Sequence, residues 1–156
     1  MIEWKLPPEI KIYEALGCLA DGRLREEKGE VRVYSSSGNK FYIILYDAEQ
    51  NAIMTNDNGT YWKGYLGYPA ITYLMSIGKI QFQEKHSVAL KDIPWKDINT
   101  KNKNDFEKTK EDVHKIIVEN GGDLEDFKNE VKSILQQIVD LGMNKLGKRM
   151  KPPSGY

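Results

Sequence analysis

The 156-residue sequence contains one cysteine and two histidines, and its 23 basic and 23 acidic side chains leave no net charge. The single cysteine, Cys18, excludes an intramolecular disulfide and any zinc site built from several cysteines. No run of about 18 apolar residues is present, so no segment is a candidate transmembrane helix. The N-terminal segment MIEWKLPPEI also lacks the apolar stretch of a signal peptide. These absences predict a cytoplasmic protein with no bound metal or cofactor.

Catalytic motifs are missing as well. The sequence has no Gly-x-Ser-x-Gly nucleophile elbow, no phosphate-binding P-loop and no dinucleotide-binding glycine motif after a strand. His86 lies in a lysine-rich segment and His114 lies within a helical pattern, and both are interpreted as structural or solvated residues. Cys18 lies inside a predicted helix without a cationic neighbour, which is typical of a small core side chain. The sequence therefore favours a non-enzymatic protein and leaves an enzyme open.

Apolar residues make up 40% of the chain and aromatic residues 10%, which is enough to build a hydrophobic core. Changes in composition and periodicity divide the chain into four parts. We expect an α+β core domain over residues 1–84, a polar connector over 85–104, a helical hairpin over 105–148 and a basic, flexible tail over 149–156.

The predicted fold class is α+β, with an antiparallel meander of three to four strands that is packed by two helices and followed by the helical hairpin. Helical spacing of apolar residues occurs over 9–20, and Gly22 is expected to adopt the left-handed conformation after it. The strand over 40–47 has apolar residues on both faces, which predicts a central strand covered on both sides. Further strands are expected over 30–35 and 52–55, extended segments over 60–65 and 80–82, and a helix over 69–77.

The predicted hairpin consists of two amphipathic helices. Asn104 and Asp123 are their expected N-caps, and glycines at 121–122 separate the helices. The second helix carries an apolar stripe of Leu124, Phe127, Val131, Ile134, Ile138 and Leu141. A stripe of this kind packs on the core or binds another helix. We therefore predict a protein partner or self-association through this hairpin.

The segment NDNGTYWKGYLGYP combines amide, acidic and aromatic side chains with three glycines. Such combinations occur in ligand pockets and interfaces, but a strand-to-helix corner with aromatics in the core explains them as well and is favoured. A calcium loop is excluded, because Met54 would occupy its first ligand position. For a pocket, Asp57→Asn is expected to remove ligand binding with little change in melting temperature. The candidate binding residues are Asn56, Asp57, Asn58, Tyr61, Trp62, Tyr65 and Tyr68.

The C-terminal segment is basic, with Lys145, Lys148, Arg149 and Lys151 and no acidic residue near them. Such a segment can contact nucleic acid or an acidic partner. Basic residues also stabilise the end of a helix, and a solvated tail is the favoured interpretation. Nucleic-acid binding is therefore the third candidate function, and no membrane contact is expected.

The segments IYEALGCLADGR, TNDNGTYWKGYLGYPAITYLM and SIGKI resemble a small family of conserved archaeal proteins of unassigned function. The resemblance covers roughly residues 1–80, and the stretch over 55–75 is its most specific part. It implies an intracellular archaeal protein with an α+β core, and it implies no activity and no catalytic residues.

Two classes of function are thus carried forward. The first is a non-enzymatic binding or assembly module that acts through protein–protein contacts. The second is a small-molecule-binding enzyme with a pocket around residues 56–68.

Overall fold

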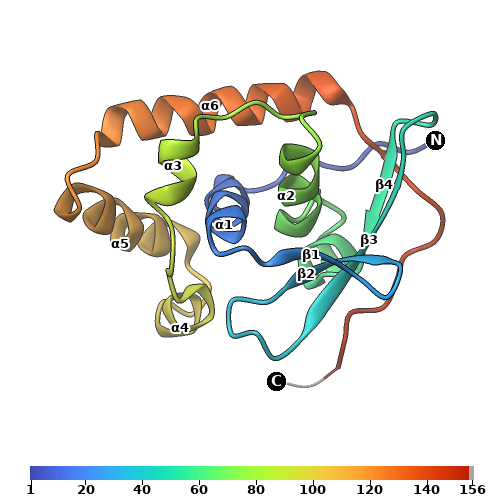
Figure 1. Cartoon of the computed structure of the whole chain (residues 1–156), viewed down its shortest axis with the longest axis horizontal. Helices are drawn as coiled ribbons and strands as arrows, with labels where there is room; N and C mark the ends of the chain where they lie inside the picture. The colour runs from blue at the N-terminus through green and yellow to red at the C-terminus, as the bar shows by residue number, and fades with distance from the viewer. Residues whose placement is uncertain (155–156) are drawn as a thin grey trace.

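The computed structural model describes residues 1–154, and it confirms the expected mixed α+β fold (Figure 1). The strands are β1 (Leu24–Glu27), β2 (Glu30–Tyr34), β3 (Phe41–Asp47), β4 (Ala52–Thr55) and β5 (Asn144–Lys145). The helices are α1 (Glu9–Ala20), α2 (Tyr68–Ser76), α3 (Glu84–Val88), α4 (Trp95–Lys101), α5 (Phe106–Glu119), α6 (Leu124–Leu141) and the π-helix η1 (Gly59–Lys63).

The sheet has the strand order β1-β2-β3-β4-β5, in which the first four strands form an antiparallel meander and β5 pairs parallel to β4. The sequence analysis missed β1, which pairs with β2 across a two-residue turn. Both turn residues, Lys28 and Gly29, have positive φ angles of 52° and 75°, as a tight hairpin turn of this length requires. Lys28 occupies a turn position at which asparagine or aspartate is typical, and for this reason the turn was not predicted.

Strand β3 is central, as predicted, but the expectation that both of its faces are covered is wrong. Tyr42 and Ile44 on one face are buried, whereas Leu45 on the other face is 45% exposed. Helix α2 packs against β3 and β4. The apolar residues on the second face of β3 therefore gave a misleading signal.

Two predicted extended segments have other structures. Residues 59–63 form η1, because the Asp57 carbonyl accepts the Tyr61 N–H and the Asp57 carboxylate accepts the Thr60 N–H. Residues 80–82 are irregular and lie along α6. The Gln81 N–H donates to Gln137 Oε1 at 2.7 Å, so a side chain of α6 satisfies a donor that a neighbouring strand would otherwise satisfy.

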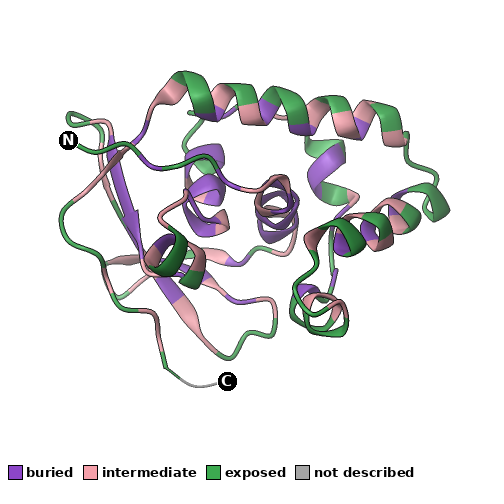
Figure 2. Cartoon of the chain, turned by 180° about the vertical axis from the view of Figure 1, so that it is seen from behind, coloured by how far each residue is buried: buried purple, intermediate pink, exposed green. Residues whose placement is uncertain are grey.

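Helix α1 lies among the other helices and is buried along most of its length (Figures 1 and 2). The Tyr13 ring meets the Phe127 ring of α6 edge-on, with centroids 5.0 Å apart. On another side, Gly17 allows the chain around α4 to approach closely. A Cβ atom at position 17 would lie 3.0 Å from both Leu90 O and Trp95 Nε1, so a larger residue there would push this part of the chain away.

Cys18 on α1 is fully buried, which confirms its predicted role as a core side chain. Burial raises the pKa of its thiol to about 11. The thiol therefore remains protonated and unreactive at neutral pH.

Helices α5 and α6 occupy the region predicted as a hairpin, and each contacts α1 as well as the other. The α6 cap is Asp123, as predicted, whose side chain accepts the Asp126 N–H. The α5 cap is Asp105 rather than Asn104, with the Glu107 and Lys108 N–H groups donating to it. The segment predicted as a connector contains α3 and α4.

The apolar stripe of α6 is used within the chain. Phe127, Val131, Ile134 and Ile138 are all buried in the core shared with α1. The stripe therefore supplies no open surface of its own, and the protein partner predicted from it stays a prediction. Among residues 1–154, no helix combines the length and apolar character needed to cross a bilayer.

The buried stripe predicts a stability effect at Ile134. Ile134→Ala is expected to lower the free energy of unfolding by about 2–5 kcal/mol, because the side chain is fully buried and its removal leaves a cavity. Urea denaturation followed by circular dichroism measures this change. Val139→Ala, at a position 46% exposed on the same helix, is the control and should change stability by roughly 0.5 kcal/mol or less. Dissociation of an oligomer at unchanged stability in Ile134→Ala would contradict the assignment.

The contact between Tyr13 and His114 predicts a dependence of stability on pH. The two side chains are hydrogen-bonded, with Tyr13 Oη 2.8 Å from His114 Nε2. Burial, followed by the charges of Lys128 and Lys110, lowers the pKa of His114 below its usual value. Since the unfolded chain then binds a proton more readily, stability should fall as the pH drops from 7 through the unfolded pKa of about 6.5 to the lower folded pKa.

His114→Gln is the matched variant, because glutamine can still accept the Tyr13 hydroxyl proton but does not titrate. We expect the loss of stability between pH 7 and pH 5 in urea denaturation to be smaller in His114→Gln than in the unaltered protein. An equal loss in both proteins would rule out His114 as the titrating group.

Candidate functional site

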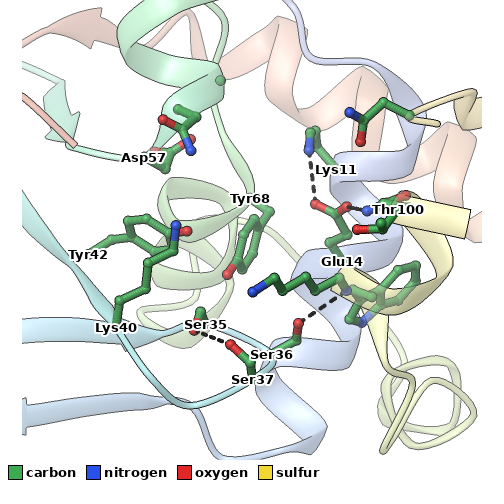
Figure 3. A pocket seen from close by; sticks show the side chains of 16 residues that line it. Lys11, Glu14, Ser35, Ser36, Ser37, Lys40, Tyr42, Asp57, Tyr68 and Thr100 are labelled. Carbon is green, nitrogen blue, oxygen red and sulfur yellow. Dashed lines mark hydrogen bonds and ion pairs between the residues drawn. The ribbon is translucent and has the colours of Figure 1, made fainter. Parts of the chain in front are cut away.

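A cavity of about 480 Å³ opens between α1, the turn that joins β2 to β3, the segment before η1 and helix α4 (Figure 3). Its volume lies within the range of roughly 300–1,000 Å³ that small-molecule pockets occupy. We call it the α1–α4 cavity. Its lining is mostly polar: three lysines, two carboxylates, and several hydroxyl and amide groups, beside Tyr42, Tyr68 and Trp95.

One wall is a buried ion pair on α1. Glu14 is only 4% exposed, and its two carboxylate oxygens accept hydrogen bonds from Lys11 Nζ at 3.1 Å and from Asn99 Nδ2 at 3.2 Å. Burial alone would lower the pKa of Lys11, but the negative charge of Glu14, helped by Tyr65 and Asp57, outweighs it and raises the pKa. Lys11 is therefore fully charged at the cavity wall.

A second wall is built around the Asp57 carboxylate, which is 5% exposed. Its Oδ1 atom accepts the hydroxyl protons of Thr55 at 2.6 Å and Thr60 at 2.7 Å, and its Oδ2 atom accepts the Thr60 N–H at 3.2 Å. Gly67 packs directly on this carboxylate, because a Cβ atom there would lie 2.1 Å from Asp57 Oδ2. Asp57 therefore holds the first residues of η1 in place and also lines the cavity.

The third wall is the turn between β2 and β3. Ser35 and Ser37 donate to Asn39 Oδ1 at 3.3 and 2.7 Å, and the Lys96 N–H of α4 donates to the Ser36 hydroxyl at 3.3 Å. This last bond joins the turn to α4 across the cavity. Figure 3 shows the serines and Lys40 opposite Lys11 and Glu14.

Aromatic side chains give the cavity its apolar part. The Tyr42 and Tyr68 rings meet edge-on with centroids 6.2 Å apart, and Lys40 Nζ lies 5.6 Å from the Tyr42 ring centroid. Trp95 is 3% exposed and packs on α1 at Gly17. Burial raises the pKa of Tyr68 well above its usual value, so its hydroxyl stays neutral.

The structure separates the seven residues predicted as a site. Asp57, Asn58 and Tyr68 line the α1–α4 cavity. Asn56 is used in the sheet, where its side chain accepts the Ile43 N–H at 2.8 Å. Tyr65 packs over Gly59. Tyr61 and Trp62 form a pair with centroids 4.7 Å apart, and Trp62 is 69% exposed on the outer surface.

Most cavity residues come from segments that the sequence analysis assigned no function. Lys11 and Glu14 belong to a helix considered only for its apolar face, and Asn99 and Thr100 belong to the predicted connector. The one local signal for a functional role of Lys11 and Glu14 was that two charged residues occur within an otherwise apolar helical face. The serine turn carried no signal of its own, because hydroxyls are common in ordinary hairpin turns.

Across residues 1–154, no three His, Cys, Asp or Glu side chains are grouped as a metal site would need. The hydrogen-bond donors of the cavity are lysine, hydroxyl and amide groups, and they lie beside aromatic rings and the Glu14 and Asp57 carboxylates. Such a set recognises an anionic ligand with hydrogen-bond acceptors.

Comparison with known proteins places the chain in a family. The family model described as Uncharacterised conserved protein UCP014422 matches residues 4–144, a range that includes α5 and α6 as well as the whole cavity. No curated protein and no solved structure matches the chain. The match confirms the uncharacterised family expected from the resemblance, while the archaeal source and the cytoplasmic location stay predictions.

The structure reverses the effect expected for Asp57→Asn. An asparagine amide would place N–H donors against the Thr55 and Thr60 hydroxyls or against the Thr60 N–H, all of which donate to the carboxylate. We expect the free energy of unfolding to fall by about 1–3 kcal/mol. Thermal and urea denaturation measure the loss. Asn58→Asp, at an exposed neighbouring position, is the control. An unchanged melting temperature in Asp57→Asn would show that the carboxylate is not needed for the fold.

Proposed function

The chain belongs to the family of uncharacterised conserved protein UCP014422, and we propose that it acts by binding a small organic anion in the α1–α4 cavity. One observation carries the proposal. Lys11, Lys40 and Lys96 reach a single cavity from α1, from the end of the β2–β3 turn and from α4. Three cations from separate elements in one cavity favour a negatively charged ligand.

Three lysines against two carboxylates leave the lining of the cavity with a net positive charge. Glu14 accepts bonds from Lys11 and Asn99, and Asp57 accepts bonds from threonines, so both are occupied inside the wall. An ammonium group carries three N–H donors, and the Lys11–Glu14 bond uses one of those of Lys11. The remaining donors can bind the oxygens of a phosphate or carboxylate.

The aromatic residues of the cavity favour a ligand that has a flat or apolar part. Tyr42 and Tyr68 line one side of the cavity and Trp95 another. Ligand pockets typically combine such apolar contacts with a few polar groups that fix orientation. The proposal assigns binding and no reaction, and it favours the small-molecule hypothesis over assembly through the α6 stripe, whose residues are buried in the chain itself.

Titration of the purified protein with pyrophosphate, citrate, AMP and neutral adenosine, at constant ionic strength, tests the proposal. We expect at least one of the three anions to raise the melting temperature and to bind in calorimetry, and adenosine to do neither. An anion at about 100 times its dissociation constant should stabilise the fold by about 2.7 kcal/mol. Absence of any anion binding, or equal binding of adenosine, would overturn the proposal.

The double variant Lys40→Met, Lys96→Gln tests whether the anion binds in the α1–α4 cavity. Methionine preserves the aliphatic contact with Tyr42 while removing the charge, so the fold should persist. The affinity for the anion should drop by about tenfold or more, which corresponds to about 1.4 kcal/mol. Lys115→Gln, Lys132→Gln removes two charges from exposed positions on α5 and α6 and should bind as the unaltered protein does. Equal affinity in both double variants would place the anion elsewhere.

A further inference from the structure

The end of η1 carries an exposed aromatic residue in a basic surface. Trp62 is 69% exposed, whereas the two other tryptophans, Trp4 and Trp95, are 9% and 3% exposed. The indole is held by its neighbour, because its ring meets Tyr61 edge-on at 4.7 Å. An exposed indole face of this kind can stack on a flat ring of a ligand.

The C-terminal segment lies against Tyr61, the residue before this tryptophan. The Arg149 guanidinium lies 4.6 Å from the Tyr61 ring centroid, and its Nη1 atom donates to Tyr61 O at 3.2 Å. Residues 2–5 join the two segments further along: the Lys5 N–H donates to Gly64 O at 3.1 Å, and the Lys145 N–H donates to Ile2 O at 2.7 Å. Tyr61 and Arg149, 88 residues apart in the sequence, are thus parts of one surface.

The charges on the η1 and C-terminal segments have one sign. No aspartate or glutamate occurs in residues 58–83 or in residues 141–154, although the chain as a whole has no net charge. Glu3 in the joining segment is bridged to Asn144, next to Lys145, and its carboxylate lies beside Gly142. We call the surface the Trp62 patch; it consists of Tyr61, Trp62, Lys63, Lys145, Lys148, Arg149 and Lys151.

We propose that the Trp62 patch binds single-stranded nucleic acid, with a base stacked on Trp62 and phosphates bound by the surrounding lysines and Arg149. Aromatic stacking combined with cations along a backbone path is the usual mode of sequence-independent single-strand binding. A double helix is less suited, because the patch is formed by a short turn and an irregular segment, with no helix or ribbon to enter a groove. A membrane surface is disfavoured because the patch lies on a five-residue π-helix and an irregular segment and includes no amphipathic helix that could lie in the interface.

Fluorescence anisotropy of a fluorescein-labelled dT12 oligonucleotide tests this inference over a range of salt concentrations. We expect saturable binding at low salt, with Trp62→Ala weakening the affinity by about tenfold and Trp62→Phe by less, since phenylalanine retains a stacking face. Quenching of tryptophan emission by unlabelled dT12 should disappear in Trp62→Ala, because the other two tryptophans are buried.

The triple variant Lys148→Ala, Arg149→Ala, Lys151→Ala tests the role of the cations. Removal of three phosphate contacts should reduce the slope of log affinity against log salt by about 2, since each contact contributes about 0.7 for a single strand. The matched control Lys108→Ala, Lys115→Ala, Lys132→Ala removes three exposed charges from α5 and α6 and should leave the slope unchanged.

Three results would overturn the inference: no binding of dT12 at low salt, the same loss of affinity in both triple variants, or tighter binding of phosphatidylglycerol vesicles or of duplex DNA than of dT12. The cavity variant Lys40→Met, Lys96→Gln should bind dT12 normally. Failure of one proposal therefore leaves the other intact.

Discussion

The buried carboxylate of Glu14 is the constraint on which the arrangement of helices depends. A charged group inside a protein is costly unless its oxygens are hydrogen-bonded and its charge is compensated. Lys11 supplies the charge from one turn earlier in α1, and Asn99 supplies the second hydrogen bond from α4. Asn99 in turn accepts the Thr109 hydroxyl of α5 at 3.0 Å. The same contacts that satisfy Glu14 therefore hold α4 and α5 against α1, and the α1–α4 cavity lies beside them.

The π-helix η1 links the two proposed sites. Its first residue, Gly59, lines the cavity together with Asn58, and Trp62 near its end is exposed in the basic surface. Single turns of π-helix are rare and occur frequently at functional sites. Asp57 fixes where this turn begins through three hydrogen bonds, and Gly64, with a φ of 72°, ends it. One short segment thus presents polar groups inward and an aromatic ring outward.

The sequence predicts the elements whose signals are local. The apolar spacing and the glycine after it place α1 within a residue, and the Asp123 cap places the start of α6. It does not predict features that depend on partners distant in the chain. Residues 80–82 alternate as a strand would, yet Gln137 of α6 satisfies the Gln81 N–H. The cavity escapes prediction for the same reason: its lysines are 29 and 56 residues apart, and no single segment contains more than one of them.

Net charge was the least informative of the sequence properties, and the structure shows why. Equal numbers of acids and bases exclude a strongly basic protein as a whole, and nucleic-acid binding was the third candidate function. Binding depends on the local potential rather than on the sum of charges. The acids of this chain are spread over the other segments, while residues 58–83 and 141–154 have none. Because the fold brings these two segments together through residues 2–5, a chain with no net charge has basic side chains of both segments on one surface, and the proposed binding depends on that local distribution.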